Sequence, residues 1–509
     1  MTKVLLINPP KKIYDRAVGF STYIPLGLLS VASMIKDICE VQILDCLVTD
    51  FEIQEYEGYT VYGTPYDKIK DRIRSFNPDI VGVSSLFSYQ SENAMNVAKI
   101  CKEINPNILV VFGGPDATVR YEHFLKNCPV DYCVVREGEK AFREFILKFN
   151  AKEPLTDIEG MAYLERGIAK LKPRKFTVNL DEYPIPAYEL VDMEVYMKNK
   201  YFYCARGAMK RSINIITSRG CPFSCVFCSV HLHMGKQFRS NSPEYVLNHL
   251  KLLIEKYNIT NFHFEDDNIS LDKARFEKIL DIIIENKLNI KWDTPNGIRA
   301  DTLNYEFLKK IKKSGCTKLK IAIEAGNQEV LDKIVKKSTS LSYMIEIAKY
   351  CHELKINVSA FYIIGFPGET IANMQETIDL AIRLLQDYGV VPSLHVALPL
   401  YGTELYETVK EKGYFTKEMT DHDLAIGAKP MGEHLITTPE FSPKDIDVLI
   451  KDYRYRKKMW LIKHALNHPI FSIKRAWNRP ILMKYLNFWE KDIQPMSISN
   501  DPITTKVTI

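Results

Sequence analysis

Short runs of β-branched and apolar residues alternate with stretches of helical periodicity along most of this 509-residue chain. Parallel strands need a long crossover connection, usually a helix, so this alternation restricts the chain to an α/β architecture. A chain of this length also exceeds what one hydrophobic core normally organises, and two or three domains are expected. Residues 151–205 interrupt the alternation with prolines and aromatics, which predicts a linker between two separate sheets.

The first predicted sheet lies within residues 1–150. Helical periods at residues 26–38 and 92–104 separate its strands. Five parallel strands predict a doubly wound, flavodoxin-like sheet, whose ligands bind beyond the carboxyl ends of the strands. The predicted strands are residues 4–7, 41–44, 80–84, 109–112 and 132–135.

Polar and turn-forming residues follow these strands. Each of them alone is explained by the need for a turn where a strand stops. Their recurrence at strand ends that share one edge of the sheet predicts a ligand site there. The residues are Asn8-Pro9-Pro10, Asp45, Ser84-Ser85, Gly113-Gly114-Pro115 and Glu137-Gly138-Glu139.

The alternation resumes after the linker, in residues 206–415. Six strand-helix units predict a partial (β/α)6 barrel, a TIM-like sheet left open on one side. The predicted strands are residues 213–217, 261–264, 290–293, 318–323, 357–363 and 393–398. Residues 416–509 form a mainly helical C-terminal region, in which the basic run 451–458 leads into residues 459–462. Such a helix suits a membrane surface or a carrier, although a solvated helix face is the commoner explanation.

Composition narrows the compartment and the partners. A net charge of +5 over this length gives no reason to expect a nucleic acid. No segment reaches membrane-spanning length, and the N-terminus fits a buried strand better than a signal peptide, so a cytoplasmic protein is expected. Its eleven cysteines are therefore expected as free thiols or metal ligands rather than disulfides.

Three of these cysteines, Cys221, Cys225 and Cys228, stand at x3 and x2 spacing directly after the first barrel strand. Thiolates in such a loop bind zinc or an iron-sulfur cluster. His231 and His233 lie near enough in sequence to complete a zinc site, so zinc is the main alternative. Against zinc, no second cysteine pair follows, and three ligands leave one metal position open for a substrate.

The motif Cys-x3-Cys-x-aromatic-Cys resembles the signature of the radical S-adenosylmethionine (SAM) superfamily, whose four-iron four-sulfur cluster chelates SAM. The resemblance extends over about two hundred residues of barrel. It implies that acidic groups hold the SAM ammonium, that an arginine holds its carboxylate, and that a glycine-rich turn holds its adenine. The implied SAM-binding residues are Phe227, Asp266, Asp267, Arg299, Glu324, Gly365 and Pro367.

Each of these residues also has a structural explanation. Glu324 could pair with a base at the strand end, Gly365 could serve a turn, and the Asp266-Asp267 pair could cap a helix. Their order at successive strand ends is what favours the SAM site.

The N-terminal domain resembles the cobalamin-binding domain found before some radical SAM barrels. The resemblance rests on the strand-end segments and on Pro25-Leu26-Gly27-Leu28-Leu29-Ser30. The Asp-x-His-x-x-Gly motif that supplies a histidine to cobalt is absent, which leaves the lower cobalt ligand open. The implied cobalamin-binding residues are Asn8, Pro9, Ser84, Ser85, Gly113, Gly114 and Glu137.

Together the two resemblances imply an enzyme that uses methylcobalamin and the 5′-deoxyadenosyl radical to methylate an unactivated carbon of a small molecule or natural-product intermediate. An external electron donor such as flavodoxin or ferredoxin is also implied. The alternatives are a radical SAM cyclase or rearrangement enzyme, a modifier of a peptide, and a non-catalytic corrinoid- or metal-binding protein. No motif in the chain separates methylation from cyclisation.

Overall fold

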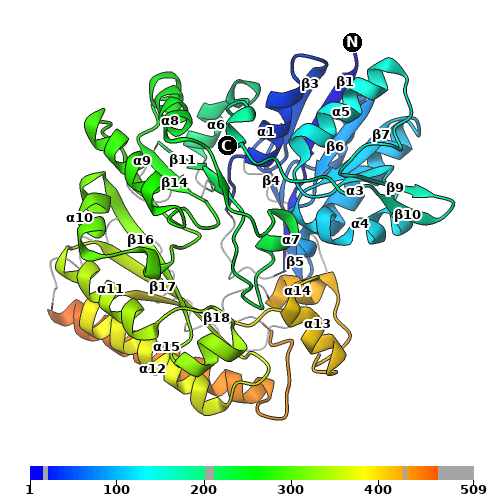
Figure 1. Ribbon diagram of the computed structural model, residues 1–509. Helices are drawn as coiled ribbons and strands as arrows, with labels where there is room; N and C mark the ends of the chain where they lie inside the picture. The colour runs from blue at the N-terminus through cyan, green and yellow to red at the C-terminus, as the bar shows by residue number, and fades with distance from the viewer. Residues whose placement is uncertain (15–20, 200, 202–210, 428–432, 468–509) are drawn as a thin grey trace.

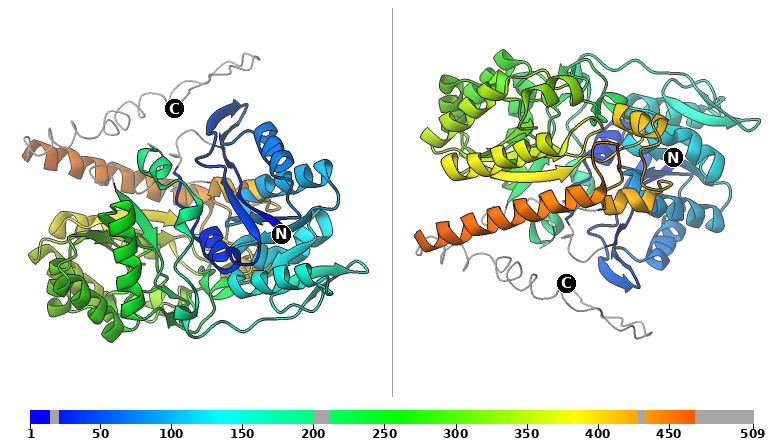
Figure 2. Two further views of the ribbon diagram at one scale, coloured as in Figure 1. Left: turned by 90° about the horizontal axis from the view of Figure 1, so that it is seen from above. Right: turned by 90° about the horizontal axis from the view of Figure 1, so that it is seen from below.

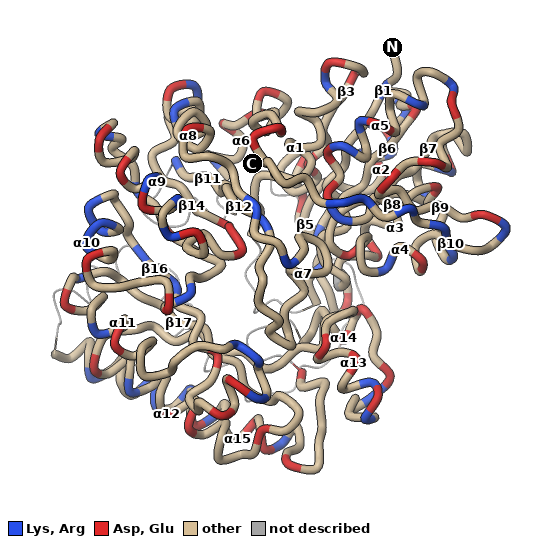
Figure 3. The backbone as a smooth tube through the Cα atoms, in the orientation of Figure 1, with Lys and Arg blue, Asp and Glu red and all other residues tan. Residues whose placement is uncertain are grey.

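The computed structural model describes the chain apart from residues 15–20, 200, 202–210, 428–432 and 468–509. Figure 1 shows two sheets, each with helices packed against it, and a C-terminal segment that touches both. Acidic and basic residues are interspersed along the backbone of both halves (Figure 3). This distribution agrees with the small net charge.

The N-terminal sheet has the predicted parallel core. Its strands β1 (Lys3–Asn8), β3 (Glu40–Asp45), β6 (Ile80–Ser84), β7 (Leu109–Gly113) and β8 (Tyr132–Val134) are ordered β3-β1-β6-β7-β8. This is the flavodoxin-like order, so the predicted fold class is confirmed. The winding reverses between β1 and β6, and the crevice at such a switch point is where doubly wound sheets bind ligands.

Both faces of this sheet are covered. Helices α1 (Leu26–Ile35) and α5 (Gly138–Ala151) bury one face, where Ala32 and Phe142 pack against Leu6. Helices α2 (Tyr66–Phe76), α3 (Ser91–Ile104) and α4 (Pro115–Asn127) cover the other. Burial on two faces explains why the strands read as continuous apolar runs.

Two parts of the N-terminal half were not predicted. Strands β9 (Met161–Glu165) and β10 (Ile168–Leu171), within the segment predicted as a linker, extend the sheet antiparallel from β8. A small separate sheet pairs β2 (Lys11–Ile13), β4 (Glu52–Tyr56) and β5 (Tyr59–Gly63). Both hairpins turn at a glycine with positive φ, Gly167 in one and Gly58 in the other. A glycine between two short strands is a local signal for a hairpin.

The second sheet is the predicted open barrel. Its six parallel strands are β11 (Ser212–Ile215), β14 (Asn261–Phe264), β15 (Lys291–Asp293), β16 (Cys316–Glu324), β17 (Asn357–Ile364) and β18 (Val391–Val396), in sequential order. Helices α8 (Pro243–Tyr257), α9 (Lys273–Glu285), α10 (Tyr305–Lys313), α11 (Leu341–Glu353) and α12 (Ile371–Tyr388) follow successive strands. β11 and β18 do not pair, so the sheet stays open.

The described helices of the C-terminal region pack against both halves of the molecule. Helix α13 (Glu404–Glu411) leads to α14 (Asp421–Gly427) beside the N-terminal domain, and α15 (Pro443–Asn467) runs along α12 (Figure 2). Ile446 and Tyr453 of α15 are buried, and Lys457 donates to the carbonyl of Pro392. The basic run is thus, at least in part, the polar face of a packed helix. None of the described helices is both long and apolar enough to span a membrane.

The contact between α14 and the N-terminal domain generates a prediction. Arg120 of α4 is nine-tenths buried and pairs with Asp116 and with Asp421, at 2.7 Å each. Arg120→Met would leave the buried Asp116 carboxylate without its cation, and we expect a loss of about 3 kcal/mol of stability. Thermal unfolding of the full chain measures it. Lys126→Met, on the exposed face of the same helix, should change stability by less than about 0.5 kcal/mol; equal effects would contradict the bridge.

Candidate active site

The cysteine loop lies between β11 and the short helix α7 (Val230–His233), at the carboxyl edge of the barrel. Cys221, Cys225 and Cys228 are each half-buried. The Cys221 N–H donates to the carbonyl of Gly235, and the Cys228 N–H donates to that of Cys225. These bonds hold the three thiols on one compact turn.

Gly220 is required by the turn that starts this loop. Its φ is +85°, and a Cβ there would lie 2.3 Å from the carbonyl oxygen of Gln237. Its N–H donates to Asp267 Oδ2 at 2.9 Å. Glycine is therefore required here, because the chain passes close to the backbone just before β13 (Arg239–Ser240).

Asp266 and Asp267, predicted to bind SAM, make hydrogen bonds that brace this loop. Asp266 is 2% exposed and accepts hydrogen bonds from the Thr217 N–H and hydroxyl and from the Ser218 hydroxyl. Burial raises the pKa of Asp267 to about 6. A strand end needs its backbone donors satisfied, and these carboxylates supply the acceptors.

Arg299 reaches the cysteine loop but is already bound. Its guanidinium donates to Asp301 and to the carbonyls of Lys337 and Ser338, and it stacks 3.5 Å from the ring centre of Phe223. The guanidinium that was predicted to bind the SAM carboxylate is therefore already paired with a carboxylate of the protein, that of Asp301.

Glu324 lies at the end of β16, where its φ is +69°, and it is 5% exposed. Its carboxylate pairs with Lys337 at 2.8 Å. The aromatic residue of the cysteine motif, Phe227, lies 5.9 Å from the ring of Phe366, in the glycine-rich turn Gly365–Gly368. The structure thus brings the predicted adenine side, the cysteine loop and Glu324 to one edge.

The three thiols fit a cluster in their chemistry. Burial raises the pKa of all three, that of Cys228 to about 12, so formation of iron-sulfur bonds must release protons. Within the described ranges, no three His, Cys, Asp or Glu side chains converge on the position of a single ion. Cysteines that bind different irons of one cluster need not converge in this way.

The carboxyl edge of the N-terminal sheet carries the second set of predicted residues. Asn8 donates to Asp45 at 2.8 Å, and Tyr196, from helix α6 (Met193–Lys198), donates to the same carboxylate at 2.6 Å. Pro9 is buried beside them. The amide of Asn8 is therefore oriented by the buried Asp45, which Tyr196 holds in turn.

Ser84, Ser85, Gly113 and Gly114 lie together at the ends of β6 and β7. Ser85 is 2% exposed and donates to Asp116, so its hydroxyl supports α4. Gly114 has φ +107°, and a Cβ there would lie 2.6 Å from the Ser85 carbonyl oxygen. Ser84 and Gly113, which are only partly buried, line a cavity.

This cavity of about 310 Å³ runs from the sheet edge into the slot between α1 and α5. Its deep end is apolar and is lined by Leu6, Val31, Val111 and Phe142. Gly82 leaves the slot open at its floor, where a Cβ would lie 2.7 Å from Leu6. Arg219 and His233, from the barrel side, line it as well. Such a slot suits a flat aromatic group attached to a larger polar ligand.

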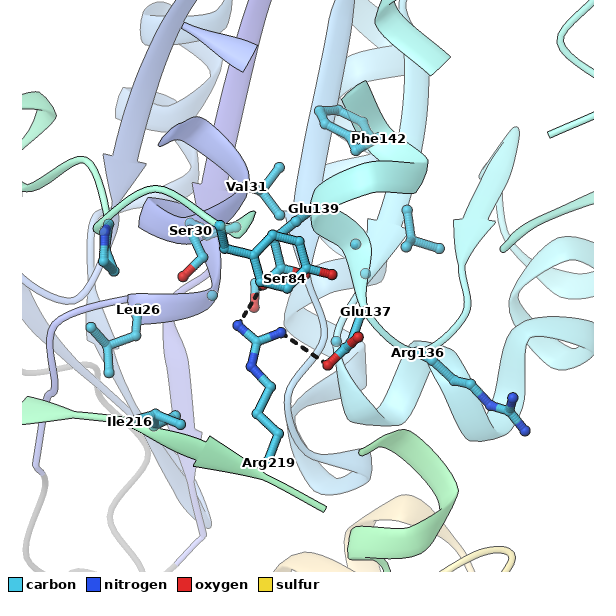
Figure 4. Close-up of a pocket in the computed structure, with 18 of the residues that line it drawn as sticks. Leu26, Ser30, Val31, Ser84, Arg136, Glu137, Glu139, Phe142, Ile216 and Arg219 are labelled. Atoms are coloured by element: carbon cyan, nitrogen blue, oxygen red, sulfur yellow. Dashed lines mark hydrogen bonds and ion pairs between the residues drawn. The ribbon is translucent and has the colours of Figure 1, made fainter. Parts of the chain in front are cut away.

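Glu137 joins the cavity to the cysteine loop. Arg219, two residues before Cys221, pairs with Glu137 at 3.1 Å and with Glu139 at 2.6 Å, and Arg239 also pairs with Glu137 at 2.6 Å. Figure 4 shows Arg219 between the two glutamates. Burial alone would raise the pKa of Glu139, but Arg219 outweighs it and lowers the pKa. Glu137, predicted to contact cobalamin, thus binds the barrel.

Comparisons with known proteins agree with these two sites. Residues 215–381 match the family described as the radical SAM superfamily, and residues 16–146 match the B12 binding domain. The chain is 32% identical to an uncharacterized methyltransferase of Pyrococcus horikoshii over 93% of its own length and 97% of that protein. The chain belongs to the B12-binding branch of the radical SAM superfamily. The cofactors of this branch are an iron-sulfur cluster, SAM and cobalamin.

Two further comparisons concern a curated enzyme and a solved structure. The chain is 29% identical to the cytidylyl-2-hydroxyethylphosphonate methyltransferase of Streptomyces wedmorensis, over 82% of the chain and 83% of that enzyme. The structure of the cobalamin-dependent SAM radical enzyme OxsB, with aqua-cobalamin and SAM bound, superposes with a TM-score of 0.68 at 16% identity. That match covers 96% of this chain and 71% of OxsB and shows a shared fold.

Sequence reasoning missed the residues that connect the sites. Arg219 lies two residues before Cys221, but nothing in one sequence pairs it with Glu137. Lys337 is one of two adjacent lysines and carried no signal. Asp301 was visible two residues after Arg299 and could have indicated an internal pair.

The buried carboxyl group of Asp45, which orients the amide of Asn8, generates a pH prediction. Burial raises the pKa of Asp45 to about 6, so the folded protein holds a proton that the unfolded chain releases near its ordinary pKa of 3.8. Stability contributed by this proton is lost as the pH rises through about 6. An asparagine at this position does not titrate. We therefore expect the free energy of unfolding of Asp45→Asn, relative to that of the wild type, to rise by about 3 kcal/mol between about pH 4 and 7.

Unfolding temperatures of the two proteins across this range measure the gap. Asp71→Asn, an exposed carboxylate, should follow the wild type. A gap that stays constant with pH would contradict a raised pKa for Asp45.

Proposed function

We propose that the protein is a cobalamin-dependent radical SAM C-methyltransferase that acts on an unactivated carbon of a small molecule. The observation that carries the proposal is the direct link, through Arg219 and Glu137, between the cysteine loop and the cavity at the sheet edge. Both sites lie at carboxyl edges of parallel strands, where such sheets bind ligands. A substrate held between them would meet both cofactors.

The chain offers residues for each cofactor. Cys221, Cys225 and Cys228 would bind the cluster. Phe227, Gly365 and Pro367 would face the adenine of SAM, and Glu324 its ammonium group. Asn8, Pro9, Ser84, Gly113 and Gly114 would face the corrin, and the apolar slot beside Val31 would take the nucleotide tail. Bound together, these cofactors supply a hydrogen-abstracting radical and a transferable methyl group.

The protein's own task is positioning and exclusion. Arg219, Arg239, Glu137 and Glu139 fix the distance between the two halves. A buried site keeps water and oxygen from reactive species. We propose that an external electron donor such as a flavodoxin or ferredoxin reduces the cluster.

Metal analysis tests the two cofactor sites separately. After anaerobic reconstitution with iron, sulfide and hydroxocobalamin, we expect iron and cobalt on the wild type. The Cys221→Ala, Cys225→Ala, Cys228→Ala triple variant should lose the iron and its electron paramagnetic resonance signal while it retains cobalt. A Cys128→Ala, Cys316→Ala variant controls for general loss of thiols. Zinc in place of iron would sink the proposal.

Filling the slot tests the cobalamin site. Val31 lies on α1 and lines the cavity, so Val31→Trp would occupy the space of the nucleotide tail. We expect hydroxocobalamin binding to fall by at least about 30-fold, as when a buried group of about 2 kcal/mol is displaced, with iron content unchanged. Lys36→Trp, exposed just after the end of the same helix, should bind cobalamin normally. Normal binding by Val31→Trp would place cobalamin elsewhere.

The nucleoside products separate methylation from cyclisation. Transfer of a methyl group from SAM to reduced cobalamin releases S-adenosylhomocysteine, whereas hydrogen abstraction by the 5′-deoxyadenosyl radical releases 5′-deoxyadenosine. We expect both products, and with methyl-deuterated SAM the label should pass to bound cobalamin. 5′-Deoxyadenosine alone would favour the cyclase or rearrangement alternative.

A further inference from the structure

The inner face of the barrel sheet carries polar and charged side chains that the sites above leave unused. Helices α8 to α12 lie outside the curved sheet, and its concave face is turned toward the N-terminal domain (Figure 1). The residues that point outward from the strands, such as Phe262, Trp292 and Ile321, belong to the apolar core. The inner face of a TIM-like barrel is usually filled by branched apolar residues as well. The polar residues on this face therefore need another explanation.

Two of the inner residues are buried with a side-chain oxygen that lacks a hydrogen-bond partner. Asn214 of β11 is 7% exposed, and Ser359 of β17 is 4% exposed. Within the described part of the chain, neither Asn214 Oδ1 nor Ser359 Oγ has a partner. Their chain neighbours Ile213 and Ala360 face the core, so these two side chains point inward. A buried polar group without a partner costs free energy, which a polar ligand on this face would offset.

Lys320 of β16 is a cation on the same face, directly opposite Ser359 in the register of the two strands. Its ammonium group lies 4.3 Å from the ring centre of Phe361 on β17. The side chain is half-buried, and among the residues that the structure describes its ammonium group has no ion pair or hydrogen bond. An aromatic ring holds an ammonium group from one side and leaves its other sides for a ligand.

The acidic side chains near Lys320 do not supply a counter-ion. Asp293 is occupied by His263, whose Nδ1 lies 2.6 Å from Asp293 Oδ1. Glu265 lies close enough to oppose the effect of burial on the pKa of Lys320, but it forms no ion pair with that lysine. Burial raises the pKa of Glu265 to about 7. A large share of this carboxyl group is therefore neutral at neutral pH and can donate a hydrogen bond.

His395 of β18 connects this group of side chains to the carboxyl edge of the barrel. Its Nε2 lies 2.9 Å from the Ser393 hydroxyl. The pKa of His395 is affected both by Glu324, at the end of β16, and by Lys320, so the imidazole lies near both. A molecule bound at Lys320 would reach the edge that carries the cysteine loop by passing His395.

An unpaired cation among hydrogen-bond donors is the complement of an anion. We propose that Lys320 binds an anionic group of the substrate, a carboxylate or a phosphate, with Ser359 and Glu265 as neighbouring donors, so that the enzyme selects anionic substrates. This inference rests on the proposed function. An anion gives both the ammonium group and the Ser359 hydroxyl a partner, whereas a neutral substrate would bury the ammonium group unpaired.

Two small anions, pyrophosphate and malonate, probe this contact. Anaerobic isothermal titration calorimetry would compare them on the enzyme loaded with its cluster and cobalamin. We expect at least one of them to bind, and Lys320→Met to weaken that binding by at least about 30-fold, as when one member of a buried charge pair is truncated. A preference for pyrophosphate would identify a phosphate group, and a preference for malonate a carboxylate.

Lys309 provides a matched control. It also lies over an aromatic ring, 5.1 Å from the ring centre of Tyr305, but it is exposed on α10 and pairs with Glu306. Lys309→Met should therefore bind both anions as the wild type does. Failure of the wild type to bind either anion, or equal binding by Lys320→Met, would overturn the inference.

A second measurement needs no variant and keeps the test decisive if Lys320→Met misfolds. Acetic anhydride acetylates neutral amines, and mass spectrometry gives the rate at each lysine. A bound anion raises the pKa of Lys320, so acetylation there should slow by about tenfold for each pKa unit, while Lys309 keeps its rate. An unchanged rate at Lys320, or no acetylation of it at all, would count against the inference.

Iron and cobalt contents are measured in each sample, because they separate the two claims. Absence of iron or cobalt from the reconstituted wild type would reject the proposed function. A fully loaded wild type that binds neither anion would reject only the role of Lys320.

Discussion

The active site depends on four buried charges that join the two sheets. Arg219 and Arg239 come from the barrel, and Glu137 and Glu139 come from the loop and helix that follow β8. The charges balance, so the group gains Coulomb energy without leaving a net charge in a region of low dielectric. Removal of one member would strand its partner, an effect of about 3–5 kcal/mol. The relative position of the cysteine loop and the cavity is set by this network together with apolar contact, because Leu29 of α1 packs in the same core as the barrel residues Ile213 and Phe264.

The same principle recurs within each half. Asp266 and Asp267 satisfy the backbone where the barrel strand gives way to the cysteine loop, Arg299 ties that loop to the Lys337 segment, and Asp45 orients Asn8 at the other edge. In all of these, a side chain predicted to touch a ligand, or its direct neighbour, makes internal hydrogen bonds that hold a strand end or loop in place. Precise positioning of reacting groups requires this supporting layer.

The sequence predicted what depends on local pattern. β1 reads Val4-Leu5-Leu6-Ile7 because both of its faces are buried, and the cysteines sit on one turn because their spacing is short. It could not predict pairings between distant loops. Lys336 and Lys337 are adjacent residues of the same type. Because the backbone is left-handed at Lys336, that side chain is exposed to solvent, whereas the side chain of Lys337 is buried. The strands β9 and β10 were missed because they are only five and four residues long and lie in a segment whose prolines and aromatics predicted a linker.

The two sites keep their shape through different interactions. In the N-terminal half, Leu6, Val111 and Phe142 hold the slot through close packing, which resists any opening. In the barrel, the end of β16 is held by the buried pair of Glu324 with Lys337, whose two charges attract each other strongly because water is excluded from them. Packing fixes the walls of a cavity on all sides, whereas a charge pair fixes the direction of two particular side chains, and the precise placement of reacting groups needs both.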